Sequence, residues 1–183
     1  MFRKRAVITM ACCCLCDQPV RTDCETGESS KTGCFTARRA SELVAGCPSL
    51  IPAHCRRCKI VIISGISSAQ VMGHYASSNV LRCAWLAEAK TLAFALGEQG
   101  IHINTLALGG TLTPGYIASL EGRVAKAGKT FDQRMAEETS NVSLRKYDAP
   151  DEVAAAVEGL LSASSDHMTG LNILHDGGFT RAY

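Results

Sequence analysis

Hydrophobic residues fall into short, regularly spaced runs over the last two thirds of the chain. "KIVIIS" at 59–64 is β-branched and apolar on both faces, "IHINTLAL" at 101–108 is a second such run, and "LNILHDGG" at 171–178 ends in a glycine turn. Runs that are apolar on both faces are typical of strands inside a parallel sheet. We therefore predict three strands, the last followed by a turn.

Longer segments with helical periodicity separate these runs. A helix is predicted from about Ser77 to Glu98, with Gly100 as its C-terminal cap. Residues 116–141 are polar and helical with a break at "AGKT", which suits a mobile excursion over a site. The stretch 149–162 is amphipathic and carries Pro150 and acidic residues in its first turn. Strand, helix, strand, helix, strand predicts a parallel sheet covered on both faces.

The helix at 78–99 has almost no polar face. Its apolar residues run nearly all round it: Val80, Leu81, Ala84, Trp85, Leu86, Ala87, Ala89, Leu92, Ala93, Phe94 and Leu96. Such a helix has to be covered on two sides. One face can pack on the sheet, and we expect a second copy of the protein to cover the other, which predicts a homo-oligomer.

The length and the charge of the chain indicate how many domains to expect and which partners to exclude. The chain has 183 residues, the size of one ordinary domain. A net charge of +2 with 20% charged residues produces no large field of one sign, so we expect neither nucleic acid nor an anionic membrane as a partner. No stretch approaches the length of a membrane span. A cytoplasmic protein is the default expectation.

Cysteines divide the chain into two compositions. Nine of the ten lie in the first 58 residues, so we treat 1–58 as a cysteine-rich, poorly defined region and 59–183 as the regular α/β region. Two CxxC pairs could form a tetrahedral zinc site: Cys13 with Cys16 and Cys55 with Cys58. Crowded extra thiols and the absence of glycine-rich knuckles favour reduced, partly buried thiols instead, and we predict no metal.

Three segments taken together resemble a known family. "KIVIIS", "KTLAFALGEQGIHINTLALGGTLTP" and "APDEVAAAVEGLLSASSDHMTGLNILHDGGFT" are similar, in order, to the C-terminal half of a short-chain dehydrogenase/reductase, with 3-oxoacyl carrier-protein reductases as the nearest type. The resemblance covers residues 59–180. It implies a partial Rossmann-like fold, a doubly wound parallel sheet in three α/β/α layers, with part of the N-terminal nucleotide-binding half missing. It also implies NAD or NADP as cofactor and a small-molecule carbonyl or alcohol as substrate.

The catalytic positions that the resemblance implies are all changed. Family members use a tyrosine as general acid and base, a lysine one helical turn later, and a serine at the end of the preceding strand. Counting back from Lys90 places these positions at Ser78, Arg82 and Gly65, the last beside Ser64. An aliphatic hydroxyl is far too weak an acid to replace a phenol, and a guanidinium keeps its proton. Arg82 could still donate hydrogen bonds to a cofactor.

A second alignment uses Tyr75 as the acid, because "YASSN" mimics the tyrosine motif with Asn79 in place of lysine. Ser64 or Gly65 would then lie behind it. Tyr75, Ser78 and Arg82 are spaced i, i+3, i+7, so they share a helix face if the helix starts early enough. The structural alternative is that Tyr75 is only an amphipathic residue at a helix start.

The nucleotide-binding turn is also altered. "RAVITMACCCLC" is similar to the family's first strand and TGxxxGxG turn, in which Thr9 is kept while Met10, Cys14 and Cys16 stand at glycine positions. Side chains there would close the approach of the pyrophosphate. Only about fifty residues separate Thr9 from the strand at 59, and strand–helix–strand units take about 30 residues each. Most of the adenosine-binding half is therefore expected to be missing.

The turn after the second strand is better kept. "LALGGTLTP" resembles the family's turn at the nicotinamide end of the cofactor, with Gly109 and Thr113 matching and Leu108 in place of a proline. A capping hydroxyl is the structural alternative for Thr113. His175 and Asp176 are expected to form a structural turn.

Two hypotheses remain. The first is a divergent NAD(P)-dependent oxidoreductase assisted by Tyr75 and Arg82. The second is a non-catalytic relative whose remaining chemistry is self-association through the apolar helix at 78–99.

Overall fold

The computed structural model describes residues 5–9 and 58–181. Within these ranges the chain forms one sheet of four parallel strands in the order β1-β2-β3-β4. The strands are β1 (Arg5–Thr9), β2 (Lys59–Gly65), β3 (His102–Leu108) and β4 (Asn172–His175). The three strands predicted after residue 58 are confirmed, and β1 pairs directly with β2 from Arg5–Lys59 to Thr9–Ile63.

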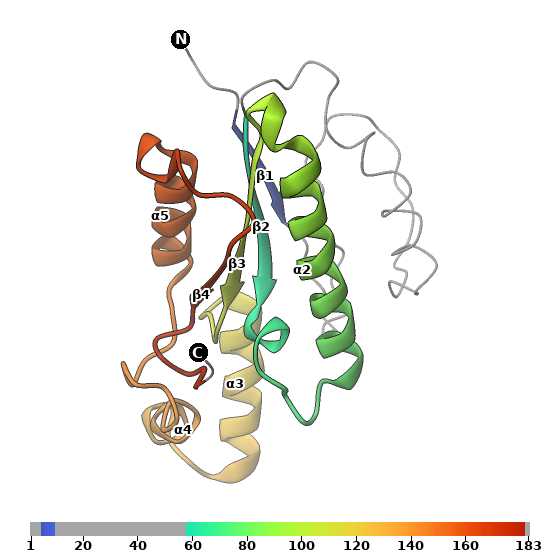
Figure 1. Cartoon of the computed structure of the whole chain (residues 1–183). Coiled ribbons are helices and arrows are strands. Elements are labelled where there is room, and N and C mark those ends of the chain that lie inside the picture. Colours follow the sequence, from blue (N-terminus) through green and yellow to red (C-terminus); the bar gives the residue numbers. More distant parts are fainter. Residues whose placement is uncertain (1–4, 10–57, 182–183) are drawn as a thin grey trace, which may run out of the picture.

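Helices connect these strands and cover both faces of the sheet (Figure 1). The helices are α2 (Ala76–Leu96), α3 (Pro114–Ala127), α4 (Phe131–Glu138) and α5 (Pro150–Leu161), with short 3₁₀ turns at Ile66–Ser68, Gly97–Gln99 and Ala163–Ser165. α2 lies against one face and α5 against the other, while α3 and α4 lie beyond the carboxyl ends of the strands (Figure 1). The predicted doubly wound α/β/α arrangement is confirmed.

Alternation along β2 divides the core into two halves. Ile60 and Ile62 face α2, where they pack with Ala89 and Ala93, whereas Val61 faces the α5 side. Residues on opposite sides of a strand alternate, so a strand that is apolar throughout can contribute to both halves. The α5 half of the core contains Val61, Leu106, Val157 and Leu160.

Lys59 is a buried cation at the start of β2. Only 3% of the residue is exposed, and its Nζ lies 2.8 Å from Asp166 Oδ1 and 2.7 Å from Ser165 Oγ. A buried charge is tolerated when it is paired and hydrogen-bonded. The contact ties β2 to the turn that follows α5.

The C-terminal end of α2 follows the sequence closely. The helix proper stops at Leu96, a 3₁₀ turn continues it to Gln99, and Gly100 then adopts a left-handed conformation with φ 72°. This position favours glycine because it has no Cβ. The predicted glycine cap is confirmed, although the last predicted helical residues form the 3₁₀ turn.

The second face of α2 is uncovered in the described chain. Ser78, Ala89 and Ala93 are its buried residues, whereas Val80 is 70% exposed and Phe94 is 77% exposed. The expectation that a second copy covers this face therefore stays a prediction.

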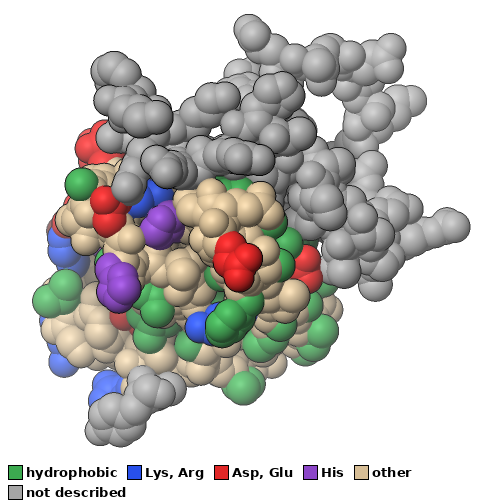
Figure 2. All heavy atoms as spheres, turned by 45° about the horizontal axis from the view of Figure 1, so that its top comes forward, with side chains coloured by type: hydrophobic (Ala, Val, Ile, Leu, Met, Phe, Trp, Pro, Cys, Tyr) green, Lys and Arg blue, Asp and Glu red, His purple; other side chains and the backbone are tan. Residues whose placement is uncertain are grey.

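The described surface carries charges of both signs, as the small net charge of the sequence predicts. Figure 2 shows a face on which acidic, basic and hydrophobic side chains of the described residues are interspersed rather than gathered by sign. Among those residues, no helix combines the length and the apolar character that crossing a bilayer requires.

Candidate functional site

The carboxyl ends of the four strands meet at one edge of the sheet. Ile63 of β2 pairs with Thr9, Gly65 pairs with Leu108 of β3, and Leu108 pairs with His175 of β4. Ligands of open parallel sheets bind at this edge. The backbone of Thr9, together with Ser64 and the residues that follow β3, is thereby brought to the same side of the molecule.

Arg82 lies directly over Gly65. A Cβ placed on Gly65 would lie 1.8 Å from Arg82 Nη1 and 2.4 Å from its Cζ, so the guanidinium occupies the space of a side chain at position 65. Nη1 also lies 3.4 Å from Ser67 Oγ. The glycine at the predicted serine position and the arginine at the predicted lysine position are therefore one coupled arrangement.

Ser78 and Arg82 share a helix face, as predicted, but Tyr75 does not continue it. Ser78 is 5% exposed and lies one turn before Arg82. The helix begins at Ala76, and Tyr75 is its N-cap with φ −126° and ψ 41°. The early helix start that the shared face required is absent, because Tyr75 stands outside the helical turn.

The loop before α2 is held by its backbone. Tyr75 N donates to Met72 O at 2.9 Å, and Asn79 Nδ2 donates to the same oxygen at 3.0 Å. Tyr75 is 43% exposed, and its hydroxyl makes no hydrogen bond to the residues that the structure describes. The phenol is thus available to a ligand, although the structure records no contact between it and Arg82.

The turn after β3 is tightly packed. Gly109 N donates to His175 O at 3.0 Å, and a Cβ placed on Gly109 would lie 2.8 Å from Asp176 Cα. Thr113 is the N-cap of α3, and its Oγ1 accepts from Tyr116 N at 3.2 Å. The capping interpretation of Thr113 is confirmed. Thr111 Oγ1 is buried and has no hydrogen-bond partner among the residues that the structure describes.

His175 is paired with an acid that the sequence did not single out. Its Nε2 lies 2.7 Å from Asp148 Oδ2. Burial, and then the neighbouring Glu152, raise the pKa of Asp148 above its usual value against the pull of His175. Asp176 instead organises the next turn, where its carboxylate accepts from Gly178 N at 2.9 Å and Thr180 N at 2.8 Å.

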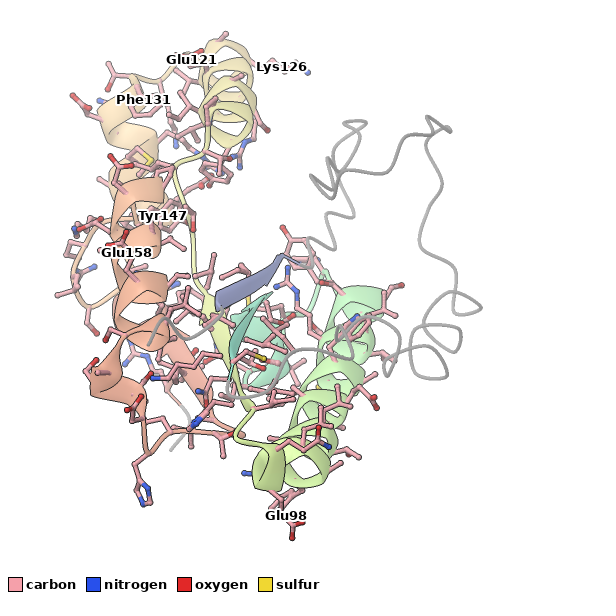
Figure 3. All side chains as sticks on the ribbon, turned by 90° about the horizontal axis from the view of Figure 1, so that it is seen from above. Glu98, Glu121, Lys126, Phe131, Tyr147 and Glu158 are labelled. Atoms are coloured by element: carbon pink, nitrogen blue, oxygen red, sulfur yellow. The ribbon has the colours of Figure 1, made fainter. Side chains whose placement is uncertain are left out.

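A network around Glu138 joins α3 to α4. Glu138 accepts from the Tyr116 hydroxyl, and its Oε1 lies 2.7 Å from Arg123 Nη1 and 2.9 Å from Arg134 Nη2. Tyr147 donates to Glu138 O at 3.2 Å, and its ring meets that of Tyr116 edge-on at 5.7 Å. Figure 3 shows Tyr147 on the sheet side of this helix pair.

The network makes its two phenols poor acids. Burial, and then the hydrogen bond to Glu138, raise the pKa of Tyr116, and burial also raises the pKa of Tyr147. A catalytic acid needs a pKa near the working pH. Both rings are therefore weaker acids than an ordinary tyrosine, which is unfavourable for the role of the family's tyrosine.

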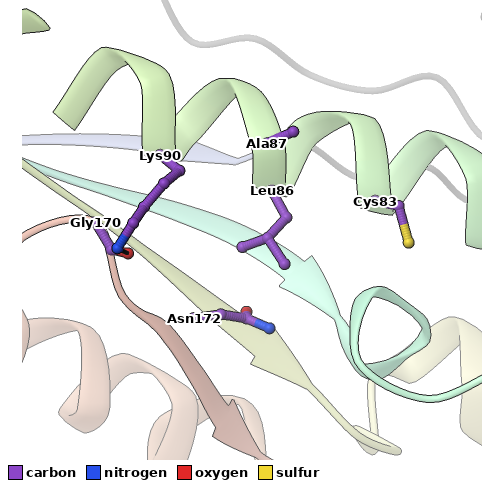
Figure 4. A pocket seen from close by; sticks show the side chains of 6 residues that line it. All are labelled: Cys83, Leu86, Ala87, Lys90, Gly170 and Asn172. Atoms are coloured by element: carbon purple, nitrogen blue, oxygen red, sulfur yellow. Dashed lines mark hydrogen bonds between the residues drawn. The ribbon is translucent and has the colours of Figure 1, made fainter. Parts of the chain in front are cut away.

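A shallow apolar hollow of about 420 Å³ lies between α2 and β4 (Figure 4). Its lining residues are Cys83, Leu86, Ala87, Lys90, Gly170 and Asn172. Lys90 Nζ donates to Gly170 O at 2.9 Å and thereby closes one end. At the other end of the hollow, Cys83 Sγ lies 3.8 Å from Ser68 O, in the turn that follows β2.

The cysteine pairs considered for zinc cannot be placed. Cys13, Cys16 and Cys55 lie outside the described residues, as do Met10 and Cys14 of the altered glycine turn, while Cys58 is fully buried in the core. Within the described ranges no three His, Cys, Asp or Glu side chains cluster as metal ligands.

Comparison with known proteins decides the family. The sequence model of the family described as enoyl-(acyl carrier protein) reductase matches residues 32–180, more than half of the chain. The chain belongs to the short-chain dehydrogenase/reductase family. The resemblance stated from the sequence is confirmed.

The short-chain relatives are distant, and the chain matches only part of them. Human dehydrogenase/reductase SDR family member 4 is 29% identical over 119 residues, which are 65% of this chain and 40% of the relative. Cyclohexanol dehydrogenase of Rhodococcus sp. (strain TK6) is 33% identical over 108 residues, or 59% of this chain and 36% of the relative. The chain thus spans less than half the length of these two relatives.

A solved structure extends the likeness of fold. L-Sorbose reductase from Gluconobacter frateurii, complexed with NADPH and L-sorbose, superposes with a TM-score of 0.70 at 21% identity. The match covers 80% of this chain and 56% of that one. At this identity the likeness supports the fold alone.

Sequence reasoning missed the contacts that join distant segments. The sequence pattern indicates Gly65 and Arg82 only as two separate substitutions, and no motif points to Asp148 or Glu138. The partners are separated by 17 residues for Arg82 and Gly65 and by 27 for His175 and Asp148, which no helical or strand period connects. Only the three-residue spacing of Thr113 and Tyr116 carried a readable signal, that of a capping hydroxyl.

Proposed function

We propose that this chain is an NAD(P)-dependent short-chain oxidoreductase of the cytoplasm that interconverts a small-molecule alcohol and the corresponding carbonyl. The supporting observation is the carboxyl edge, where the Gly65–Arg82 arrangement and the 109–113 turn end adjacent parallel strands. Family membership supplies the reaction class.

The residues after β3 fit the amide end of a nicotinamide. Thr111 Oγ1 is buried without a partner, and Thr113 Oγ1, which accepts from Tyr116 N, keeps its own proton to donate. Both groups could hydrogen-bond a carboxamide. Gly109 supports the turn from behind, since Asp176 packs where its side chain would be. A bound nicotinamide would supply or accept the hydride.

Tyr75 is the proposed proton carrier, by elimination among the described phenols. The Tyr116 and Tyr147 hydroxyls already donate to Glu138, burial raises the pKa of both phenols, and Ser78 is a weakly acidic aliphatic hydroxyl. Tyr75 is exposed at the start of the helix that delivers Arg82. A positive guanidinium near the substrate oxygen would stabilise charge that develops there.

Paired substitutions test this assignment. Tyr75→Phe is expected to lower kcat about 100-fold or more, since general acid–base catalysis contributes that much. Ser78→Ala is expected to keep kcat within about threefold, because it changes no proton carrier. NADH and NADPH oxidation with a panel of small ketones provides the rate, and nicotinamide fluorescence provides binding. Loss of turnover in Ser78→Ala with full turnover in Tyr75→Phe would refute the role of Tyr75.

The exposed side of α2 favours a second candidate function. Val80 and Phe94 are large apolar side chains left in water, as expected for a subunit interface. A non-catalytic relative would act through this self-association. Light scattering of Phe94→Glu against the parent chain tests it: a dimer that becomes a monomer, in a protein that binds neither NADH nor NADPH, would favour this candidate over the oxidoreductase.

A further inference from the structure

Arg82 has no acidic partner among the residues that the structure describes, unlike Arg123 and Arg134. Arg123 and Arg134 both pair with Glu138, whereas the one polar contact of Arg82 among the described residues is the 3.4 Å approach to Ser67 Oγ. A guanidinium carries five N–H donors in a rigid plane. Within the described part of the chain, most of those donors have no acceptor.

The space that holds this guanidinium depends on Gly65. Any side chain at that position would begin 1.8 Å from Nη1, so the guanidinium can occupy this place only while residue 65 is glycine. Ser68 lies beside them, and its Oγ donates to Gly65 O at 3.1 Å. The described groups around the guanidinium are thus backbone and serine hydroxyls, which are neutral and do not compensate its positive charge.

A partly buried, uncompensated guanidinium matches an oxyanion ligand. The planar fork binds a carboxylate through two parallel N–H···O bonds. One positive charge balances one negative charge, so a monoanionic carboxylate fits better than a phosphate, which carries more charge. We propose that Arg82, lying over Gly65 with Ser67 beside it, is a receptor for the carboxylate of a small molecule.

The assignment refines the site already described. If the proposed function holds, the substrate is a small oxo acid or hydroxy acid whose carboxylate is bound by Arg82; this part of the proposal rests on the proposed function. Binding of the carboxylate to Arg82 requires no nicotinamide cofactor. Binding measured without NADH or NADPH therefore separates failure of this inference from failure of the proposed function.

Isothermal titration of the full chain with three probes tests the receptor. Pyruvate carries the carboxylate, ethyl pyruvate is the matched neutral molecule, and inorganic phosphate is the competing oxyanion. We expect pyruvate to bind about tenfold or more tightly than ethyl pyruvate, because a charge-assisted bidentate pair is lost in the ester. Equal affinities, no detectable pyruvate binding, or displacement of pyruvate by equimolar phosphate would each overturn the proposal.

Variants locate the binding. Arg82→Met should weaken pyruvate binding about tenfold or more, and Gly65→Ser should do the same by taking the place of the guanidinium. Arg82→Lys should fall between Arg82→Met and the parent, because it keeps the charge and loses the fork. Lys126→Met removes an exposed cation at the outer end of α3 and serves as the control (Figure 3).

A loss of binding can be assigned to the lost contact only if the variant still folds. Circular dichroism should give each variant the parent spectrum, and Arg82→Lys provides the test if Arg82→Met fails to fold. Pyruvate affinity unchanged in a folded Arg82→Lys and a folded Gly65→Ser would place the carboxylate elsewhere and overturn the proposal.

Discussion

Gly65 is the last residue of β2 and Gly109 directly follows β3, and the two glycines are required for different reasons. Beyond the end of β3, a Cβ on Gly109 would meet the main chain of Asp176 at 2.8 Å. At the end of β2, a Cβ on Gly65 would meet only the tip of the Arg82 side chain. The first glycine is needed by the packing of the fold, while the second makes room for one movable guanidinium. At this edge of the sheet, one glycine is therefore needed for backbone packing and the other for the position of a candidate ligand-binding side chain.

Gly109→Ala should produce the largest effect on stability. The main chain of Asp176 cannot move without disturbing the β4 turn, so we expect a loss of about 2–3 kcal/mol in the free energy of unfolding. Urea denaturation measures this loss. A cost below about 0.5 kcal/mol would show that the turn after β4 moves freely, contrary to the packing described.

Glu138→Ala should be the next most costly change. It leaves Arg123, Arg134 and the Tyr116 hydroxyl without their shared acceptor, and we expect a loss of about 1–3 kcal/mol. The matched control is Glu121→Ala, which removes an exposed carboxylate from α3 (Figure 3). If thermal denaturation shifts equally in both variants, the network does not hold α3 to α4.

Gly65→Ala should cost much less than Gly109→Ala. The Arg82 side chain can swing aside, so we expect less than about 1 kcal/mol. The same denaturation series measures it. A cost equal to that of Gly109→Ala would mean that the guanidinium cannot leave its place, and the distinction between the two glycines would fail.

The strands and helices were predictable from the sequence because their signals are local. The apolar run at 59–64 predicts a strand, and the structure has β2 there. Gly100 predicts the end of α2 and Pro150 the start of α5; the 3₁₀ turn that continues α2 ends beside Gly100, and α5 begins at Pro150. The start of α2 was less readable, since Tyr75 lacks a capping side chain and only the backbone shows that it stands outside the helix.

The site was predictable only in part, for the same physical reason. The resemblance to the family, counted back from Lys90, identified Ser78 and Arg82, and the helical period then puts both on one face of α2. The contact of Arg82 with Gly65 depends on how α2 is placed against the end of β2, which no local spacing encodes. The Asp148–His175 pair likewise depends on the approach of the segment before α5 to β4.

Glu152→Gln should give the smallest effect, with a distinctive pH dependence. The hydrogen bond from Lys146, and then that from Ala149 N, lower the pKa of Glu152 from 4.5 to about 2. A lowered pKa means that the stabilisation is present above 4.5 and disappears as the pH falls through about 2. The parent should therefore be slightly more stable than the variant near neutral pH, and the difference should vanish in strong acid.

Urea denaturation across this pH range provides the measurement, with Glu158→Gln as the matched exposed carboxylate on α5 (Figure 3). A difference between parent and Glu152→Gln that grew on acidification would have the wrong sign for the lowered pKa.

The central claim is that glycine at 65 exists to hold the guanidinium of Arg82 at the carboxyl edge. NMR of the Arg82 side chain, with ¹⁵N label at Nε, tests it in the parent chain and in Gly65→Ser. The account predicts a dispersed, slowly exchanging Nε–Hε signal in the parent that moves to the position of a free arginine in Gly65→Ser. Identical signals in the two proteins would contradict it.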